Sequence, residues 1–482
     1  MDWKTLLCSE RVRKVTGGSS SSDGRTEFEK DYQRIISSAS FRRLQDKTQV
    51  FPLDKSDFIR TRLTHSLEVA NFARSIGRML GKRIAGIDPE FTEGMINDIC
   101  SILECAGLIH DIGNPPFGHF GEDAIRDWFK RNLSQLSFNG VKLTDYLSEQ
   151  QIADFYNFEG NTQALRVVSK LHFIVDEHGM NLTKALLATI MKYPVSSVQI
   201  RYNKKDPDRD IAHKKMGYFM ADEDVFNDVQ SSCKTFGKRH PLTFALEAAD
   251  DIAYRTADIE DAVKKGLLDL NVLINELRLA IENAKKEKSR KTIISTSEKL
   301  LGKLEYYYNK AIDQKYEDPQ LYAVQNWLVR VQGILLADAV DSFINNYDAI
   351  MNGEYKKELL AGVPGSLVMD VLGDVALRYA FLSEPILKLE VAADAIFDYL
   401  LTRLVKALLY YDTPDWKKMS TAVDTKMVGL ISSSFMQIYR IHSKNTDEKT
   451  RLYLRLLLAT DYVSGMTDSY ARRLYRELSG ID

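Results

Sequence analysis

The residues best suited to chemistry lie in the stretch 108–122, Leu-Ile-His-Asp-Ile-Gly-Asn-Pro-Pro-Phe-Gly-His-Phe-Gly-Glu. An apolar run ends there in an imidazole next to a carboxylate, His110 and Asp111. Glycines and prolines follow, and they predict a rigid turn because proline lacks a backbone donor and clashes with a preceding helical turn. Beyond it, His119 and Glu122 are three apart and share one face of a helix. An isolated His-Asp pair more often lies on the surface or caps a helix than binds a ligand. The interpretation therefore depends on the other residues that accompany it.

Side chains of the metal-ligand type stand at four widely separated positions, His65, His110, Asp111 and Asp250. This spacing is unlike the close-set pattern of a zinc finger, and it predicts a site assembled by packing helices. Two imidazoles and two carboxylates leave water positions on a six-coordinate ion, which suits Mn, Mg, Fe, Co or Ni better than a closed structural zinc. Such an ion lowers the pKa of bound water and yields a hydroxide nucleophile near neutral pH.

The region around Asp250 predicts a helix with one polar stripe, because Asp250, Tyr254 and Asp258 are spaced four apart. A solvated helix face with salt bridges has the same pattern, and periodicity alone does not choose between the two.

Basic residues accompany the candidate ligands. Arg62 precedes His65 by three positions and faces the same side if their helix begins early enough. Lys192 ends an expected helix, and Lys214 and Lys215 follow later. Cations beside a hard metal favour a polyphosphate substrate, since both neutralise phosphate oxygens. Any single lysine is nevertheless more often a surface residue.

The elements that must position these residues are helices. After the loop-like segment 16–24, helical periodicity covers most of the chain and strand signals are sparse, so we expect an all-α fold. Thr64 and Ser66 are candidate helix caps. Asn139-Gly140 predicts a short hairpin, and 173–182 predicts a turn with brief strands. The principal expected helices are 31–47, 64–80, 93–110, 121–136 and 242–265.

Composition restricts the class of protein. The 482 residues are 44% apolar and carry a net charge of −2, so no strong overall field draws the chain to nucleic acid. None of the four cysteines forms a Cys-x-x-Cys pair, which indicates reduced, buried thiols. No signal core and no membrane-length apolar run is visible. We therefore expect a soluble, cytoplasmic protein.

Taken together, these residues resemble the HD superfamily of metal-dependent phosphohydrolases and, within it, the deoxyguanosine triphosphate triphosphohydrolases (dGTPases). Their order along the chain matches the family's order, and no motif is visibly broken. The resemblance implies an HD-domain helical core with an additional C-terminal helical region. The motifs that carry it are 42–52, 60–69, 110–122, 157–161, 191–194, 215–218, 247–254 and 461–468.

The resemblance also implies a role for each matching residue. The metal ligands would be His65, His110, Asp111 and Asp250, with Asp250 preferred to Asp251 because Tyr254 lies four positions later. His119 would be the catalytic histidine and Glu122 its partner. The remaining residues would bind substrate: Arg62, Asn161, Lys192, Tyr193 and one of Lys214 or Lys215, with Lys215 taken, at the triphosphate; Tyr254 and Asp258 at the sugar; Gln49 and Val50 near the 3′-hydroxyl and the base.

The implied reaction is hydrolysis of dGTP, with other dNTPs as candidates, to deoxynucleoside and inorganic triphosphate. A water activated by a divalent metal, Mn or Mg first and Co, Ni or Fe as options, would attack the α-phosphorus. The resemblance also implies a homo-oligomer, with a hexamer as one form, and single-stranded DNA as a candidate regulator. The alternatives are another HD phosphohydrolase, such as a nucleotidase or cyclic-nucleotide phosphodiesterase, or a nucleic-acid-binding protein with a secondary metal site.

We divide the chain provisionally into three parts. Residues 1–27 form an N-terminal segment with a Gly/Ser loop, and residues 28–265 form the phosphohydrolase core. Residues 266–482 form a helical region expected to complete the pocket and to make oligomer contacts.

Overall fold

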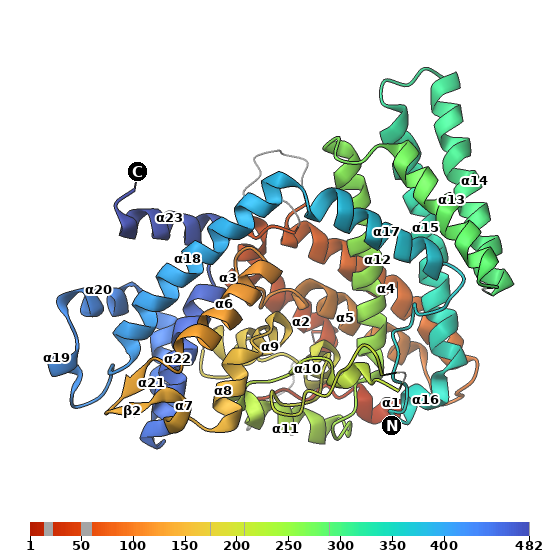
Figure 1. The fold of residues 1–482 in the computed structure, drawn as a ribbon. Helices are drawn as coiled ribbons and strands as arrows, with labels where there is room; N and C mark the ends of the chain where they lie inside the picture. The colour runs from red at the N-terminus through yellow and green to blue at the C-terminus, as the bar shows by residue number, and fades with distance from the viewer. Residues whose placement is uncertain (14–22, 50–59, 174, 207, 289, 482) are drawn as a thin grey trace.

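The computed structural model describes residues 1–13, 23–49, 60–173, 175–206, 208–288 and 290–481. Within these ranges the fold is all-α, as predicted, and the one sheet is the hairpin of β1 (Ser137–Phe138) and β2 (Val141–Lys142). None of the described helices combines the length and the apolar composition needed to cross a membrane. Figure 1 shows the helices gathered around a common body, from which α13 and α14 project at one end.

The helices of the first half are α1 (Trp3–Leu6), α2 (Glu27–Ile36), α3 (Ala39–Arg42), α4 (Arg62–Ala85), α5 (Glu93–Ile109), α6 (His119–Asn132), α7 (Leu143–Tyr146), α8 (Glu149–Tyr156), α9 (Gly160–Arg166), α10 (Lys184–Ile190), α11 (Glu223–Ser232) and α12 (Pro241–Lys264). Those of the second half are α13 (Leu270–Lys286), α14 (Lys291–Asp313), α15 (Pro319–Asn345), α16 (Tyr347–Met351), α17 (Ser366–Ala376), α18 (Glu384–Leu408), α19 (Trp416–Met419), α20 (Ala422–Leu430), α21 (Ser433–Ser443), α22 (Glu448–Ser464) and α23 (Asp468–Ser479). Short 3₁₀ or π turns are η1 (Arg43–Asp46), η2 (Val167–Leu171), η3 (Ile211–His213), η4 (Met220–Asp222) and η5 (Leu377–Phe381).

Two apolar cores support the site. The first joins α4, α5 and α12 to α15 and α17, and the second joins α6 to α18 and α22. The turn between α5 and α6, residues 110–118, is named the HD turn for its His110-Asp111 pair. It connects the two cores, because Ile112 is buried in the first and Phe117 in the second. Both cores draw on residues from either side of position 265. The division of the chain at residues 27 and 265 stays a prediction.

Helix α4 begins earlier than expected. Its N-cap is Thr61, whose side chain accepts from the Thr64 backbone N–H, while the Thr64 hydroxyl caps the Thr61 N–H in return. The predicted caps Thr64 and Ser66 were therefore wrong, because the reciprocal capping box formed one turn upstream. This start brings Arg62 into the helix and onto the face of His65.

The single helix expected over 31–47 is broken into α2, α3 and η1. Helix α2 ends at Ile36, and Ser38 then caps α3 by accepting from the Phe41 backbone N–H. Serine side chains compete for backbone groups, so a serine-rich junction favours a cap over helix continuation.

Two smaller predictions had different outcomes. The Asn139-Gly140 hairpin is confirmed, and both turn residues have positive φ. The brief strands expected over 173–182 are absent from the part of this segment that the structure describes, which excludes residue 174. There the chain turns through Gly179 and Asn181, both at positive φ.

The four cysteines are free thiols, as predicted. Cys100, Cys105 and Cys233 are buried, but Cys8 is partly exposed, so the expectation of burial was wrong for that one residue.

Candidate active site

Four side chains from three helices converge on one point. His65 comes from α4, His110 and Asp111 follow the end of α5, and Asp250 comes from α12. Ligand atoms of His65, His110 and Asp111 lie within 4.8 Å of one another. Asp250 Oδ1 lies 3.2 Å from His65 Nε2 and 3.3 Å from His110 Nε2. The predicted ligand set is thus assembled in space.

The orientation of His110 fits metal binding. Its Nδ1–H donates to the Gly107 carbonyl at 2.7 Å, which leaves the Nε2 lone pair free and fixes the tautomer. Nε2 is buried and accepts no hydrogen bond from the described residues. Asp111 is fixed similarly, because Asn114 Nδ2 donates to Asp111 Oδ1 at 2.8 Å. Two imidazoles and two oriented carboxylates form a donor set for a hard divalent cation.

Two cations hold the carboxylates ionised. The Arg62 guanidinium donates to Asp111 Oδ2, and Lys192 Nζ lies 3.1 Å from Asp250 Oδ2. Burial opposes ionisation of Asp250, but the charge of Lys192 counters burial, and the pKa of Asp250 lies well below its usual range. The neighbouring Asp251 has no such contact with the part of the chain that the structure describes; burial and the Asp250 charge raise the pKa of Asp251 to about 7. Of the two adjacent aspartates, Asp250 is the one that lies beside the two imidazoles.

His119 and Glu122 form a second unit at the first turn of α6. His119 Nδ1–H donates to Glu122 Oε2 at 3.0 Å, and the other oxygen, Oε1, accepts from the Gly160 backbone N–H at 2.8 Å. Glu122 is buried, whereas the His119 side chain is 73% exposed. The hydrogen bond and charge of Glu122 raise the pKa of His119. His119 can therefore keep a proton and present Nε2 outward.

The backbone before His119 requires its glycine. Phe117 and Gly118 both have a φ of 61°, in the left-handed region. A Cβ at Gly118 would lie 2.4 Å from Nη2 of Arg62. Glycine there lets the chain reverse against the Arg62 side chain and start α6 with His119 at its first position.

A buried carboxylate, Glu159, organises the neighbouring polar residues. Its Oε2 lies 2.7 Å from Lys215 Nζ, and its Oε1 accepts from Asn161 Nδ2 at 2.8 Å. Lys214 instead lies 3.7 Å from Glu358, which distinguishes the two adjacent lysines. The charges of Arg62 and Lys215 both act to lower the pKa of His119, against the larger effect of Glu122.

Two of the predicted sugar-side residues, Tyr254 and Asp258, lie on α12. The Tyr254 ring stacks on Phe381 of η5 with centroids 6.1 Å apart. Asp258, one turn later, is buried, and burial together with Asp261 raises its pKa well above the usual range. Tyr193 is buried beside Lys192. Gln49 is partly buried with its Oε1 unpartnered among the described residues, and Val50 lies outside the described residues.

Sequence reasoning missed the supporting residues. Glu159 and Asn114 lie inside quoted motifs but were given no role, although each fixes a named site residue. Glu159 is the acidic residue of the 157–161 motif. Its presence could have predicted a role in orienting a basic side chain, because phosphate-binding cations are often held by a carboxylate.

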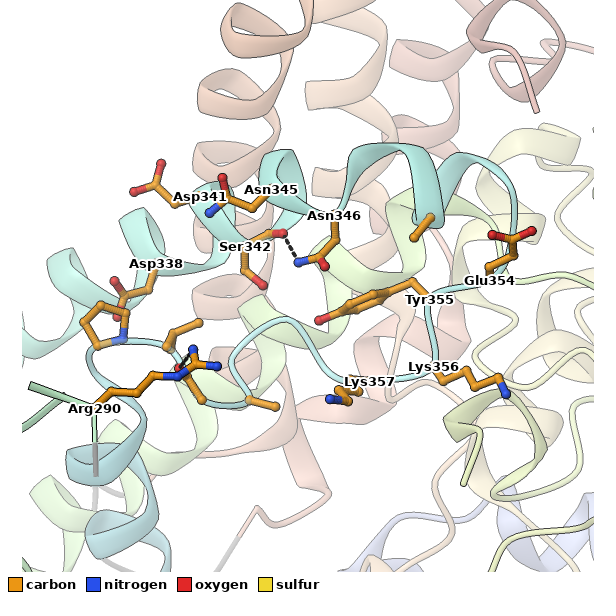
Figure 2. Close-up of a pocket in the computed structure, with 15 residues that line it drawn as sticks. Arg290, Asp338, Asp341, Ser342, Asn345, Asn346, Glu354, Tyr355, Lys356 and Lys357 are labelled. Carbon is orange, nitrogen blue, oxygen red and sulfur yellow. Dashed lines mark hydrogen bonds between the residues drawn. The ribbon is translucent and has the colours of Figure 1, made fainter. Parts of the chain in front are cut away.

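Cavity size does not locate this site. A cavity of about 700 Å³ lies elsewhere, between the end of α15, α16 and the loop that leads to α17 (Figure 2). Its polar lining includes Arg290, Tyr355 and Lys357. None of the predicted site residues that the structure describes lines it, so the donor geometry, rather than volume, indicates the candidate active site.

Comparisons with known proteins show that three of the four clustered side chains, His65, His110 and Asp111, lie within a known domain. A family model described as HD domain matches residues 62–184, which span His65 to α10. A deoxyguanosinetriphosphate triphosphohydrolase-like protein of Listeria monocytogenes is 43% identical over the full length of both chains. One of Synechocystis is 31% identical, again over both full lengths. A deoxyguanosinetriphosphate triphosphohydrolase of Klebsiella pneumoniae is 31% identical over 94% of each chain.

The fold and the HD match define the class: the chain is a hydrolase of the HD type. Its full-length similarity makes it a member of the family of deoxyguanosinetriphosphate triphosphohydrolase-like proteins. The resemblance inferred from the motifs is thereby confirmed.

Proposed function

We propose that this protein hydrolyses dGTP to deoxyguanosine and inorganic triphosphate, and that other dNTPs are candidate substrates of the same site. The printed names of the relatives support the substrate class, and the arrangement of His119 beside the ligand cluster supports the bond that breaks. A homo-oligomeric assembly and regulation by single-stranded DNA are further proposals that rest on the resemblance alone.

His65, His110, Asp111 and Asp250 would hold a divalent cation, with Mn or Mg as the first candidates and Co, Ni or Fe as others. Bound there, it would neutralise phosphate oxygens and lower the pKa of a water near the α-phosphorus. Two nearby cations serve the same substrate. Arg62 and Lys192 already contact the carboxylates of this cluster. They would therefore also lie within reach of phosphate oxygens bound to the cation.

His119 supplies the proton. Cleavage between the α-phosphorus and O5′ releases an alkoxide, which near neutral pH needs a general acid, and Nε2 of His119 is the outward-facing donor. Glu122 holds the ring through Nδ1 and favours its protonated form. Losing this acid should cost roughly 10²–10⁴ in rate.

The remaining predicted contacts orient the substrate. Lys215 and Asn161, both held by Glu159, would bind the triphosphate from the His119 side. Tyr254 would lie against the sugar, where its ring leaves no room for a 2′-hydroxyl and so discriminates against ribonucleotides. Asp258 and Gln49 would bind sugar hydroxyls.

The proposal rests on two contacts: buried Glu122 orients the solvent-facing His119, and the preceding residue, Gly118, lies against Arg62, which donates to Asp111 of the candidate ligand cluster. The test uses purified protein with Mn²⁺ or Mg²⁺, each of the four dNTPs and GTP, and ion-exchange separation of products. We expect deoxyguanosine with tripolyphosphate, and little product from GTP. Deoxynucleoside monophosphate with pyrophosphate would contradict the proposed bond cleavage.

A matched pair of variants tests the acid. His119→Gln should lower kcat by roughly 10²–10⁴. His178→Gln is the control, because His178 Nδ1 makes a similar contact with Asp176, at 3.1 Å, outside the site. Equal rates for both variants and for wild type would remove His119 from the mechanism.

A further inference from the structure

The motif 461–468 has no role in the site described so far, yet its last residue reaches that site. Asp468, at the start of α23, is 1% exposed. Its Oδ1 accepts from the Phe117 backbone N–H at 3.0 Å. Its Oδ2 accepts from the Thr48 backbone N–H at 3.0 Å and from the Thr48 hydroxyl at 2.6 Å. One buried carboxylate therefore joins the segments at Thr48 and Phe117 to α23, from which they are 420 and 351 positions distant in sequence.

A second buried group ties the same three segments. Lys47 Nζ donates to the carbonyl of Asn114 and, at 2.8 Å, to the carbonyl of Ser464. The HD turn is thus held at Asn114 by Lys47 and at Phe117 by Asp468. Asn114 also donates to the candidate ligand Asp111. The turn between the ligand pair and the catalytic histidine is fixed from the C-terminal part of the chain.

The contact at Phe117 holds a residue whose backbone conformation is unfavourable on its own. Phe117 is a non-glycine residue at positive φ, a conformation that costs free energy unless neighbouring contacts hold it. Only Gly118 separates it from His119. On the other side, Thr48 immediately precedes Gln49, a predicted substrate contact. A shift at Asp468 would therefore displace the proton donor and the sugar-side segment together.

We propose that Asp468 is a positioning residue of the active site, which holds the turn before His119 and the strand-like segment before Gln49 in register. This inference rests on the proposed function for its kinetic consequence. Its structural consequence, a fixed turn at residues 113–118, stands independently of the substrate.

Asp468→Asn tests the proposal, because an amide can accept on one side only and must turn its NH₂ toward either the Phe117 or the Thr48 N–H. We expect kcat for dGTP to fall about 10–100-fold, the cost of a misplacement of about 1 Å. KM should stay within about threefold, since the phosphate-binding cations are untouched. In hydrogen–deuterium exchange, peptides covering 113–118 should exchange faster than in wild type.

Ser469→Ala is the matched control. The Ser469 hydroxyl donates to Asp46 Oδ1 at 2.8 Å and so joins α23 to η1, but it contacts neither Thr48 nor Phe117. It should leave kcat and the exchange of 113–118 unchanged. If Asp468→Asn does not fold, Thr48→Val, which removes one of the three donors, should give the same changes to a smaller degree.

The outcomes separate the two proposals. If wild type hydrolyses no dNTP, the proposed function fails, and hydrogen exchange alone decides the role of Asp468. If Asp468→Asn keeps wild-type kcat and wild-type exchange at 113–118, the positioning role is wrong. A loss of activity that matches the loss of folded protein, with the turn equally protected in the folded fraction, also overturns it.

Discussion

Replacing Glu122 with glutamine should move the basic limb of the pH–rate profile to lower pH. The Glu122 carboxylate raises the pKa of His119 through the hydrogen bond to Nδ1. The protonated ring is the acid that the reaction needs, so kcat is full below this pKa and falls as pH rises through it. Glutamine removes the charge and lowers the pKa of His119. The fall in kcat should therefore begin at a lower pH in Glu122→Gln than in wild type.

The size of the shift follows from the geometry. A hydrogen bond to a charged partner contributes about 1.5–3 kcal/mol. Because the His119 side chain is 73% exposed, solvent screens the pair and the lower end applies. Because about 1.4 kcal/mol is a factor of ten in an equilibrium constant, kcat of Glu122→Gln on the basic limb should be about tenfold below that of wild type. The glutamine oxygen can still accept from the Gly160 N–H, so we expect the fold of this turn to survive.

The assay is kcat for dGTP at saturating substrate and metal across the neutral and basic range. Asp127→Asn is the control, since it removes one carboxylate from an exposed position of the same helix, α6. It should leave the limb in place. A Glu122→Gln profile that overlays the wild-type profile would refute the claim that Glu122 sets the protonation of His119.

Three further predictions concern metal, substrate and packing. Asp111→Asn should weaken metal binding by at least about 100-fold, measured as metal content after dialysis; full wild-type occupancy would contradict its role as a ligand. Lys215→Met should raise KM for dGTP about 10-fold or more through a lost charged contact, while Lys214→Met, beside Glu358, should not; equal KM values for the two variants would argue against this assignment. Gly113→Ala should lower the free energy of unfolding by about 1–3 kcal/mol, because its Cβ would lie 2.0 Å from the Ala164 nitrogen. Gly302→Ala, inside α14 with open space around its Cβ, should raise the free energy of unfolding by about 1 kcal/mol. Denaturant unfolding that finds Gly302→Ala less stable than Gly113→Ala would refute the packing argument.

Turns and helix ends that depend only on neighbouring residues could be predicted from the sequence. The Asn139-Gly140 turn formed its hairpin because the two residues tolerate positive φ. The HD turn ended α5 and started α6 at His119 as its glycines and prolines indicated. The prediction of a single helix over 31–47 was wrong. Apolar periodicity favoured a continuous helix, but Ser38 caps the start of a new one.

The candidate ligand residues could be selected from sequence because their types are restricted by chemistry, and the structure brings these four side chains together. The residues that support them could not. Asp468 lies 351 positions from Phe117, and no spacing rule connects positions so far apart. Adjacent lysines were likewise ambiguous until packing placed Lys215 at Glu159 and Lys214 at Glu358.

The most direct test of the account is hydrolysis of dGTP in ¹⁸O-labelled water, with mass spectrometry of both products. Attack of water on the α-phosphorus with departure of O5′ predicts one ¹⁸O in the tripolyphosphate and none in deoxyguanosine. Label in the deoxyguanosine would mean that the C5′–O bond breaks. Formation of dGMP and pyrophosphate would place cleavage at another bond, and either result would contradict the role assigned to His119.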